Sequence, residues 1–329
     1  MSSVKLRMLS SDDVKNCLNM NEAIDVMRDA FVQLSSGEAI VPQRIHIEIP
    51  EKNAVSLFMP VYLPKINLTG IKVVSVGNDN KEKGLPLIHG LVLIVDATSG
   101  IPLAMMDGAY LTALRTGAGS GLATELLARK DSTTVAIFGA GSQGRTQLEA
   151  VCTVCDIEEA FIFDTNNTQA EILVKEMAIK LGIKITIATD GSELEKADIV
   201  CTATTSSEPV FNDKYIKPGT HINAVGSYKL KMREIPAETV LRSKIVVDST
   251  ESCLAEAGDF LLNLDSGKKV EDLFHAELGQ IASGMKPGRE SEEEITFFKS
   301  VGNAVQDLSA AARIYEKAEE LNLGQIVEL

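Results

Sequence analysis

The stretch Thr133-Thr-Val-Ala-Ile-Phe-Gly-Ala-Gly-Ser-Gln-Gly144 decides the fold of this chain. Its first half is apolar and β-branched, as in a buried strand, and its second half has the glycine pattern GxGxxG. A helical pattern follows over 143–154, then a strand pattern over 160–163 and a helix over 168–181. Strand, glycine turn, helix and strand predict a βαβ unit of a parallel sheet.

Each glycine of this turn has its own predicted task. Gly139 permits the tight turn, Gly141 lets the backbone approach a pyrophosphate, and Gly144 lets the helix pack on the strand. Asp164, at the end of the second strand, suits the ribose hydroxyls of NAD(H) and would repel the extra phosphate of NADP(H). The neutral residues 165–167 leave use of NADP(H) open. The alternative is an ordinary glycine turn with a helix-capping aspartate.

Further strand patterns follow in the central region, separated by helices or loops, at 184–187, 199–203, 221–225 and 245–248. Strands that alternate with helices form parallel, doubly wound sheets. We therefore expect an α/β fold with a Rossmann domain over 119–301.

The N-terminal third has a different pattern. A helix is predicted over 20–35, and alternating extended segments near 43–49, 54–59, 70–76 and 91–96 favour an antiparallel sheet. A helix of small residues over 112–127 then leads into the central region.

The C-terminal region, 292–319, is predicted to be mostly helical, with Gly302 as its break, and to pack back on the N-terminal sheet. This predicts a discontinuous α+β domain of residues 1–118 plus 302–329.

Composition and charge exclude several classes of protein. The 329 residues carry 32 Lys and Arg against 46 Asp and Glu, a net charge of −14, which is the wrong sign for binding nucleic acid. The longest apolar runs fall far short of the ~18 residues of a membrane span, and 1–10 is no apolar signal sequence. We expect a soluble, cytoplasmic protein with neither nucleic acid nor membrane as a partner.

Cysteine and histidine spacing predicts neither disulfides nor a metal site. The five cysteines are odd in number and scattered, which is typical of a reducing compartment. The four histidines share no HxH or HExxH spacing.

Three cations, Arg44, Lys72 and Arg115, lie on or beside apolar segments. Unpaired charges are costly there, so an anionic group is expected among them. Each one alone is more often a salt-bridge partner or a long side chain that reaches solvent. Sequence spacing does not show whether the three converge.

Seven motifs along nearly the whole chain carry a family resemblance. They are Phe58-Met-Pro-Val-Tyr62, Gly70-Ile-Lys72, Leu111-Thr-Ala-Leu-Arg-Thr-Gly-Ala118, Gly139 to Gly144, Asn223-Ala-Val-Gly226, Glu277-Leu-Gly279 and Lys299-Ser-Val-Gly-Asn-Ala-Val-Gln-Asp307. In this order they resemble the ornithine cyclodeaminase/mu-crystallin family. The resemblance implies an NAD(P)-binding Rossmann domain, a discontinuous domain that binds substrate and dimerises, and a homodimer. It also implies that Arg44, Lys72 and Arg115 converge on a substrate carboxylate.

The expected cofactor contacts lie in the same motifs and at the ends of the predicted strands. They are Arg115, Thr116, Gly139, Ala140, Gly141, Ser142, Gln143, Gly144, Asp164, Thr165, Ala203, Thr204, Val225, Gly226, Ser300 and Val301.

Two departures from the family pattern bear on the reaction. Cyclodeaminases of this family carry an aspartate base two residues after the glycine of Asn-Ala-Val-Gly, where this chain has Tyr228. They also carry a glutamate just before the Met-Pro pair, where this chain has Val55-Ser-Leu-Phe58. A diamino acid would lose the partner of its second amine, and its cyclisation would lose a base. A compact cyclic imine needs neither group.

The sequence therefore predicts NAD(P)H-dependent reduction of a cyclic 2-imino acid, Δ1-pyrroline-2-carboxylate or Δ1-piperideine-2-carboxylate, to L-proline or L-pipecolate. Its carboxylate is expected on Arg44, Lys72 and Arg115, with Lys72 as the first candidate for the acid that protonates the imine. Ser227 or Tyr228 is expected to position a water.

Three other functions stay open from the sequence. An alanine dehydrogenase would depend on ammonium, and an ornithine cyclodeaminase would release ammonia without net use of NADH. A ligand-binding protein like the crystallin branch would keep the cofactor site without turnover.

Overall fold

The computed structural model describes residues 4–261 and 269–329. The chain forms two compact units, unit 1 with residues Met1–Arg115 and Asn303–Leu329, and unit 2 with residues Thr116–Gly302. The sequence-based boundaries, 118/119 and 301/302, differ from these by a few residues. The first boundary falls inside helix α3 (Gly108–Leu127), so an unbroken helix leads from one unit into the next.

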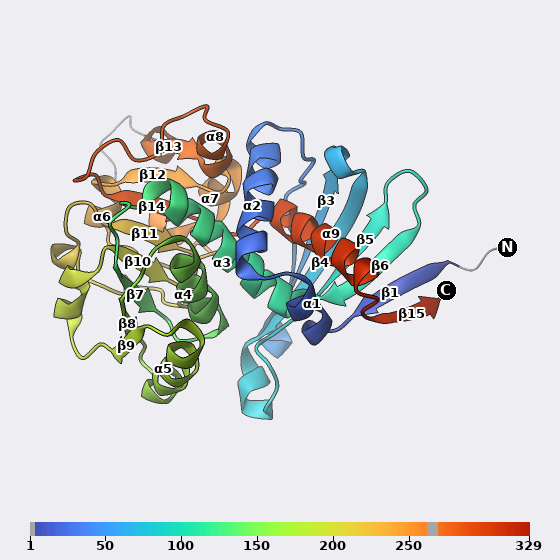
Figure 1. Cartoon of the computed structure of the whole chain (residues 1–329), viewed down its shortest axis with the longest axis horizontal. Helices are drawn as coiled ribbons and strands as arrows, with labels where there is room; N and C mark the ends of the chain where they lie inside the picture. Colours follow the sequence, from blue (N-terminus) through green and yellow to red (C-terminus); the bar gives the residue numbers. More distant parts are fainter. Residues whose placement is uncertain (1–3, 262–268) are drawn as a thin grey trace. The chain divides into compact units, whose positions relative to one another are not determined.

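Unit 2 is built on a sheet whose described strands are all parallel, in the order β13-β12-β14-β11-β10-β7-β8-β9. The central strands are short runs buried on both faces, whereas the edge strands β9 and β13 are only partly buried. Figure 1 shows the strands of this sheet. The expected α/β class with a Rossmann-type parallel sheet is confirmed. The strands are β7 (Thr134–Phe138), β8 (Glu159–Phe163), β9 (Lys184–Ile187), β10 (Ile199–Thr202), β11 (His221–Ala224), β12 (Lys244–Val247), β13 (Phe274–Glu277) and β14 (Thr296–Lys299).

Two hydrophobic cores cover the two faces of this sheet. In β7, Val135 and Ile137 belong to the core that also holds Leu148 of α4, whereas Ala136 and Phe138 belong to the other core. This alternation is what a doubly wound sheet requires. The helices of unit 2 are α4 (Ser142–Val154), α5 (Asn167–Leu181), α6 (Ala237–Leu241), α7 (Thr250–Glu256) and α8 (Leu278–Ala282), with 3-10 turns η4 (Gly191–Lys196), η5 (Asp213–Tyr215), η6 (Gly258–Phe260) and η7 (Val270–Leu273).

The prediction of a mostly helical segment over 292–319 is wrong in its first third. Residues Thr296–Lys299 form β14, which lies between β11 and β12 with all its side chains buried. Gly302 follows with a φ of +83°, a left-handed conformation that glycine adopts readily. Asn303 then caps α9 (Ala304–Glu320), because its side chain accepts from the backbone N–H of Val305.

Unit 1 is built on a second sheet, in the order β15-β1-β6-β5-β4-β3-β2. Its pairs are antiparallel, as predicted for the N-terminal third, except that β1 runs parallel to β6. The strands are β1 (Lys5–Leu9), β2 (Ile45–Ile49), β3 (Ala54–Leu63), β4 (Leu68–Gly77), β5 (Ile88–Asp96), β6 (Pro102–Asp107) and β15 (Gln325–Glu328). The helices are α1 (Ser11–Cys17), α2 (Met20–Ser35) and α9, with 3-10 turns η1 (Pro50–Lys52), η2 (Pro64–Ile66) and η3 (Asn78–Lys83).

Helix α9 packs across β3, β4 and β5, and α2 packs on α9 (Figure 1). Alternate residues of β4 face α9 and are buried, including Gly70 and Lys72. A Cβ at Gly70 would lie 2.8 Å from Leu308 of α9, so the glycine permits this close approach.

The opposite side of this sheet, which we call the open face, stays partly exposed. The strand register places Ile45, Phe58, Val73 and Leu91 in one row across it. Ile45 is 58% exposed and Leu91 37%. Within the described parts of the chain, none of the helices combines the length and apolar character that a membrane crossing needs.

Candidate active site

The glycine turn after β7 has three glycines with three different surroundings. Gly139 has a φ of +102°, and a Cβ there would lie 2.6 Å from the carbonyl oxygen of Ala203. A Cβ at Gly144 would overlap the carbonyl oxygen of Gly139, so α4 packs directly on the turn. Gly141 faces open space, with nothing within 4 Å of a Cβ. This is the arrangement that a pyrophosphate-binding turn requires.

A cavity of about 700 Å³ opens beside this turn, at the carboxyl ends of β7, β8 and β10. The strand order reverses between β7 and β10, the position where open α/β sheets bind ligands. Phe138 and Phe163 stack in it, with ring centroids 4.3 Å apart. Its lining is Phe138, Gly139, Gly141, Phe163, Asp164, Thr165, Ala188, Thr189, Asp190, Ala203, Thr204, Thr205, Ser206, Pro209 and Val210.

Asp164 is bonded to the glycine turn by one carboxylate oxygen and to its own loop by the other. Oδ2 accepts the N–H of Ala140 at 2.6 Å, and Oδ1 accepts the N–H of Asn166 at 2.7 Å. Asp190 lines the same cavity, and its Oδ1 accepts the N–H of Ser192 at 2.7 Å. Sequence reasoning did not single out Asp190, because it follows β9, outside the glycine motif.

Apart from Arg115, which belongs to unit 1, the other expected cofactor contacts lie near this cavity or elsewhere in unit 2. Ala140, Ser142 and Gln143 belong to the turn and the start of α4. The carbonyl of Thr116 accepts from Gln147 of α4 at 3.4 Å, and Val225 and Gly226 follow β11.

Ser300 and Val301 follow β14 and are bound by a buried carboxylate. Asp248 Oδ2 accepts the hydroxyl of Ser300 at 2.7 Å and the N–H of Val301 at 3.0 Å. Neither residue is among those that line the cavity.

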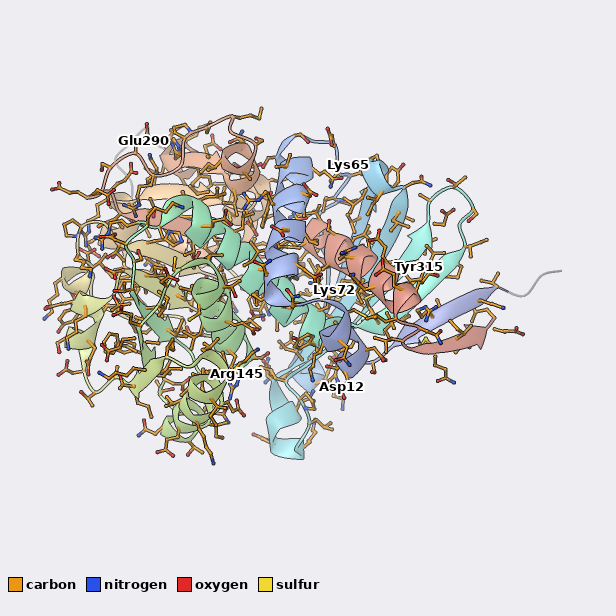
Figure 2. The ribbon with its side chains drawn as sticks, viewed as in Figure 1. Asp12, Lys65, Lys72, Arg145, Glu290 and Tyr315 are labelled. Carbon is orange, nitrogen blue, oxygen red and sulfur yellow. The ribbon has the colours of Figure 1, made fainter. Side chains whose placement is uncertain are left out.

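A second polar cluster lies in unit 1, where β4 meets the N-terminal end of α9 (Figure 2). Nζ of Lys72 is 2.7 Å from Oδ2 of Asp307, and Nε of Arg115 is 2.9 Å from Oδ1 of the same carboxylate. Arg115 also donates to Oε1 of Gln306 at 3.0 Å. All four side chains are buried. The structure thus brings Lys72 and Arg115 together on Asp307.

Burial lowers the pKa of Lys72 to about 7, because desolvation disfavours the charged ammonium. The positive charge of Arg115 acts in the same direction, Asp307 opposes it, and Arg44 lowers the pKa further. Arg44 therefore lies within electrostatic reach of Lys72. Lys72 is poised to gain and lose a proton near neutral pH.

Asp307 is a residue of this cluster that the sequence did not identify as functional. Its family motif was visible, and its place on a helix predicted a salt-bridge partner, which the ion pairs with Lys72 and Arg115 confirm. The available signal was the excess of cations in apolar segments, since buried cations need a buried anion.

Ser227 and Tyr228 lie in the loop after β11. The hydroxyl of Ser227 donates to the carbonyl of Met232 at 2.8 Å, inside its own loop, and the residue is fully buried. Tyr228 packs against the hydrophobic core of unit 2. In this structure both residues contribute to the shape of the loop.

The described residues contain no group of three or more His, Cys, Asp or Glu side chains arranged to hold a metal ion. The cysteines, all of which are described, carry free thiols.

Comparison with known proteins places this geometry among imino-acid and amino-acid oxidoreductases. The model of the ornithine cyclodeaminase/mu-crystallin family matches residues 4–322. The Δ1-pyrroline-2-carboxylate reductase of Bacillus thuringiensis is 39% identical over 322 residues, which cover 97% of this chain and 99% of the relative.

Two solved structures are similar over nearly their whole length. The Δ1-pyrroline-2-carboxylate reductase of Thermococcus litoralis, in complex with NADH and L-proline, has a TM-score of 0.93 at 45% identity and covers 97% of this chain and 99% of its own. An archaeal alanine dehydrogenase dimer with bound NAD has a TM-score of 0.90 at 33% identity. The match covers 98% of this chain and 99% of the alanine dehydrogenase chain.

Proposed function

The chain belongs to the ornithine cyclodeaminase/mu-crystallin family, as its motifs predicted, and we propose that it reduces a cyclic 2-imino acid with NADH. The observation that carries this proposal is the similarity to the Thermococcus litoralis reductase bound to NADH and L-proline. The expected products are L-proline from Δ1-pyrroline-2-carboxylate and L-pipecolate from Δ1-piperideine-2-carboxylate.

The cavity of unit 2 suits the cofactor. The open side of Gly141 leaves room for the pyrophosphate, and Asp164 lies where it would accept hydrogen bonds from ribose hydroxyls. Asp164 and Asp190 would both repel a 2′-phosphate, so NADH is the expected cofactor and NADPH the weaker one.

The cationic cluster of unit 1 suits the substrate. Lys72 and Arg115 pair with Asp307, and Arg44 lies within electrostatic reach of Lys72. Guanidinium groups bind carboxylates through paired hydrogen bonds. The substrate carboxylate would bind these three cations.

Lys72 is the proposed proton donor. When bound, NADH supplies a hydride to the carbon of the C=N bond and is oxidised to NAD+. Lys72 donates a proton to the imine nitrogen, so that the double bond becomes a C–N single bond with a new N–H, and it regains a proton from water. A pKa of about 7 suits this exchange.

The test is NADH and NADPH oxidation with each cyclic imine, with pyruvate in the presence and absence of ammonium, and with ornithine. Turnover on an imine without ammonium is expected, faster with NADH. Silence on both imines, with turnover only on pyruvate plus ammonium, would contradict the proposal and identify an alanine dehydrogenase. Ammonia release from ornithine would identify a cyclodeaminase.

We also propose that two copies associate through the open face of the seven-stranded sheet. Ile45 and Leu91 are exposed there in one apolar row with Phe58 and Val73, and β2 exposes all its residues. Apolar surface of this kind marks association sites in globular proteins. The similar archaeal alanine dehydrogenase is a dimer, which supports the same state here.

A further inference from the structure

The side chain of Glu234 lies where the loops after β10 and β11 meet. Its Oε1 accepts the backbone N–H of Thr204 at 2.6 Å and the Thr204 hydroxyl at 2.9 Å. Its Oε2 accepts the N–H of Gly226 at 2.8 Å and of Ser227 at 3.0 Å. One carboxylate therefore bonds both loops, and each of its oxygens serves a different loop.

Glu234 is fully buried, and a second carboxylate fixes its backbone. Oδ1 of Asp259 accepts the N–H of Glu234 at 2.7 Å and that of Ile235 at 3.1 Å. Asp259 also pairs with Lys299, at 2.8 Å, and both are fully buried. Burial raises the pKa of Glu234, while the positive charge of Lys299 lowers it. A carboxylate with both oxygens accepting is the form that these donors require.

One of the two bonded loops lines the proposed cofactor site, and the other packs directly behind it. Thr204 lines the cavity together with Gly139 and Asp164. A Cβ at Gly226 would overlap Thr204 and Oε1 of Glu234, so the second loop lies directly against the first. The relative position of the loops therefore depends on the carboxylate between them.

We propose that Glu234 is a positioning residue, which holds the loops after β10 and β11 at the spacing that NADH binding requires. This inference rests on the proposed NADH-dependent function. Glu234 touches neither cofactor nor substrate in this role, since it acts through Thr204, Gly226 and Ser227.

Glu234→Gln is the informative variant, because it keeps the size of the side chain and removes one acceptor. Whichever way the amide is placed, its NH₂ group faces a backbone N–H, from Thr204 on one side or from Gly226 and Ser227 on the other. Two donors cannot pair, so the backbone N–H groups of one loop lose their acceptor.

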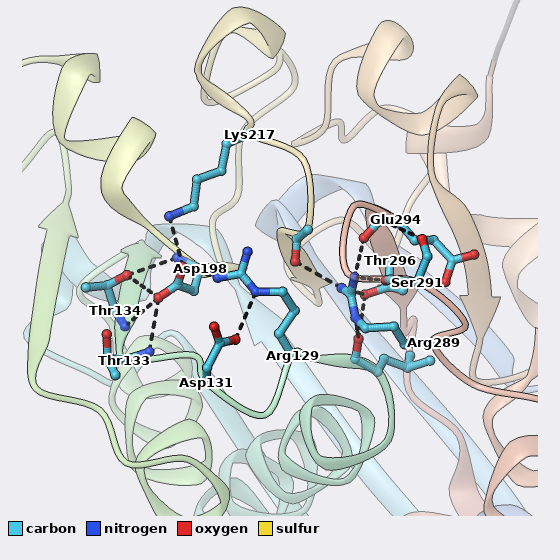
Figure 3. A network of polar contacts seen from close by, with 12 residues as sticks. Arg129, Asp131, Thr133, Thr134, Asp198, Lys217, Arg289, Ser291, Glu294 and Thr296 are labelled. Carbon is cyan, nitrogen blue, oxygen red and sulfur yellow. Dashed lines mark hydrogen bonds and ion pairs between the residues drawn. The ribbon is translucent and has the colours of Figure 1, made fainter.

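Asp198 offers a matched control in the same unit (Figure 3). This buried carboxylate accepts the N–H groups of Thr133 and Thr134 and the Thr134 hydroxyl, and it pairs with Arg129 and Lys217. It lies just before β10, at the amino ends of the parallel strands, whereas the cavity lies at their carboxyl ends. Asp198→Asn should therefore weaken unit 2 without disturbing the cofactor loops.

The measurement is NADH affinity in the absence of imine, with hydrogen exchange of residues 203–206 and 225–228, for the wild type and both variants. Glu234→Gln is expected to weaken NADH binding by about tenfold or more and to speed exchange in both loops. Asp198→Asn is expected to stay within about twofold of the wild type. If Glu234→Gln does not fold, Glu234→Asp is measured, because its shorter side chain keeps the charge and reaches one loop.

Two results would overturn the inference. If the wild type binds NADH and the Glu234 variant binds it equally well, or no more weakly than Asp198→Asn does, the inference alone fails. If the wild type binds no NADH and oxidises none with an imine, the proposed function fails and the inference fails with it.

Discussion

Asp307 holds two buried cations, Lys72 and Arg115, through the two oxygens of one carboxylate. Two opposing effects act on the pKa of Lys72 in this arrangement. Burial and the neighbouring guanidinium groups favour the neutral amine, while Asp307 favours the ammonium that can donate a proton. At the residue scale, the proton affinity of Lys72 therefore depends on a helix residue far along the chain.

Lys72 should govern the pH dependence of imine reduction. Because its pKa is about 7 and the ammonium is the donor, kcat/KM should fall as the pH rises through about 7. Asp307→Asn removes the negative charge that favours the ammonium, so the fall should move to lower pH. The measurement is a pH profile of kcat/KM for both proteins. A profile that the variant leaves in place would show that Asp307 does not set this pKa.

Replacement of Lys72 itself should separate chemistry from cofactor binding. Lys72→Met keeps an apolar stem of similar length and removes the proton donor, so turnover should fall by about 100-fold or more. NADH affinity should stay unchanged, because the cavity of unit 2 contains no part of β4. Normal turnover in this variant would exclude Lys72 as the acid.

At the element scale, local pattern predicted several elements of both units well. The predicted bounds of α2 (Met20–Ser35) and β9 (Lys184–Ile187) agree with the structure to the residue. Strand β14 was missed because a run of four residues with two central phenylalanines, beside a helical segment, does not distinguish a buried strand from a helix. An anion among the cations and a salt bridge of Asp307 were each expected, but the sequence did not connect the two, because Arg115 and Asp307 lie 192 residues apart. Pairing over such distances comes from the tertiary fold.

The glycine turn gives a prediction in which two similar substitutions have different effects. Gly144→Ala places a methyl group against the carbonyl of Gly139, so it should lower stability by about 1–3 kcal/mol and also weaken NADH binding. Gly141→Ala adds a methyl group in open space, so its melting temperature should match the wild type while NADH affinity falls about tenfold. Thermal melts and NADH titrations check both. Equal stability of the two variants would contradict this view of the turn.

At the scale of the whole molecule, the acidic chain carries many of its exposed large apolar side chains in residues 40–101 of unit 1. A net charge of −14 disfavours close association of two copies by charge alone. Burial of the apolar side chains of the open face would contribute the favourable free energy of association that offsets this repulsion.

The dimer prediction has a control on the same chain. Ile45→Asp combined with Leu91→Asp places carboxylates on the open face and should give a species of one chain, 35.4 kDa, where the wild type sediments at twice that mass. Ile179→Asp changes an isoleucine that is 81% exposed on α5 of unit 2, and it should leave the dimer intact. Analytical ultracentrifugation measures all three. A monomeric wild type would refute this assembly.

The discontinuity of unit 1 has a consequence for the nascent chain. A ribosome makes β3, β4 and β5 early, but α9, which covers them, emerges only after all of unit 2. Unit 2 can fold during synthesis, but until α9 emerges the face of the first sheet that α9 covers stays exposed. Exposed hydrophobic surface of this kind is what chaperones bind. Lys72 and Arg115 cannot form their ion pairs with Asp307 until α9 has been synthesised. The pKa of Lys72, the proposed acid, therefore reaches its native value only after translation of this helix.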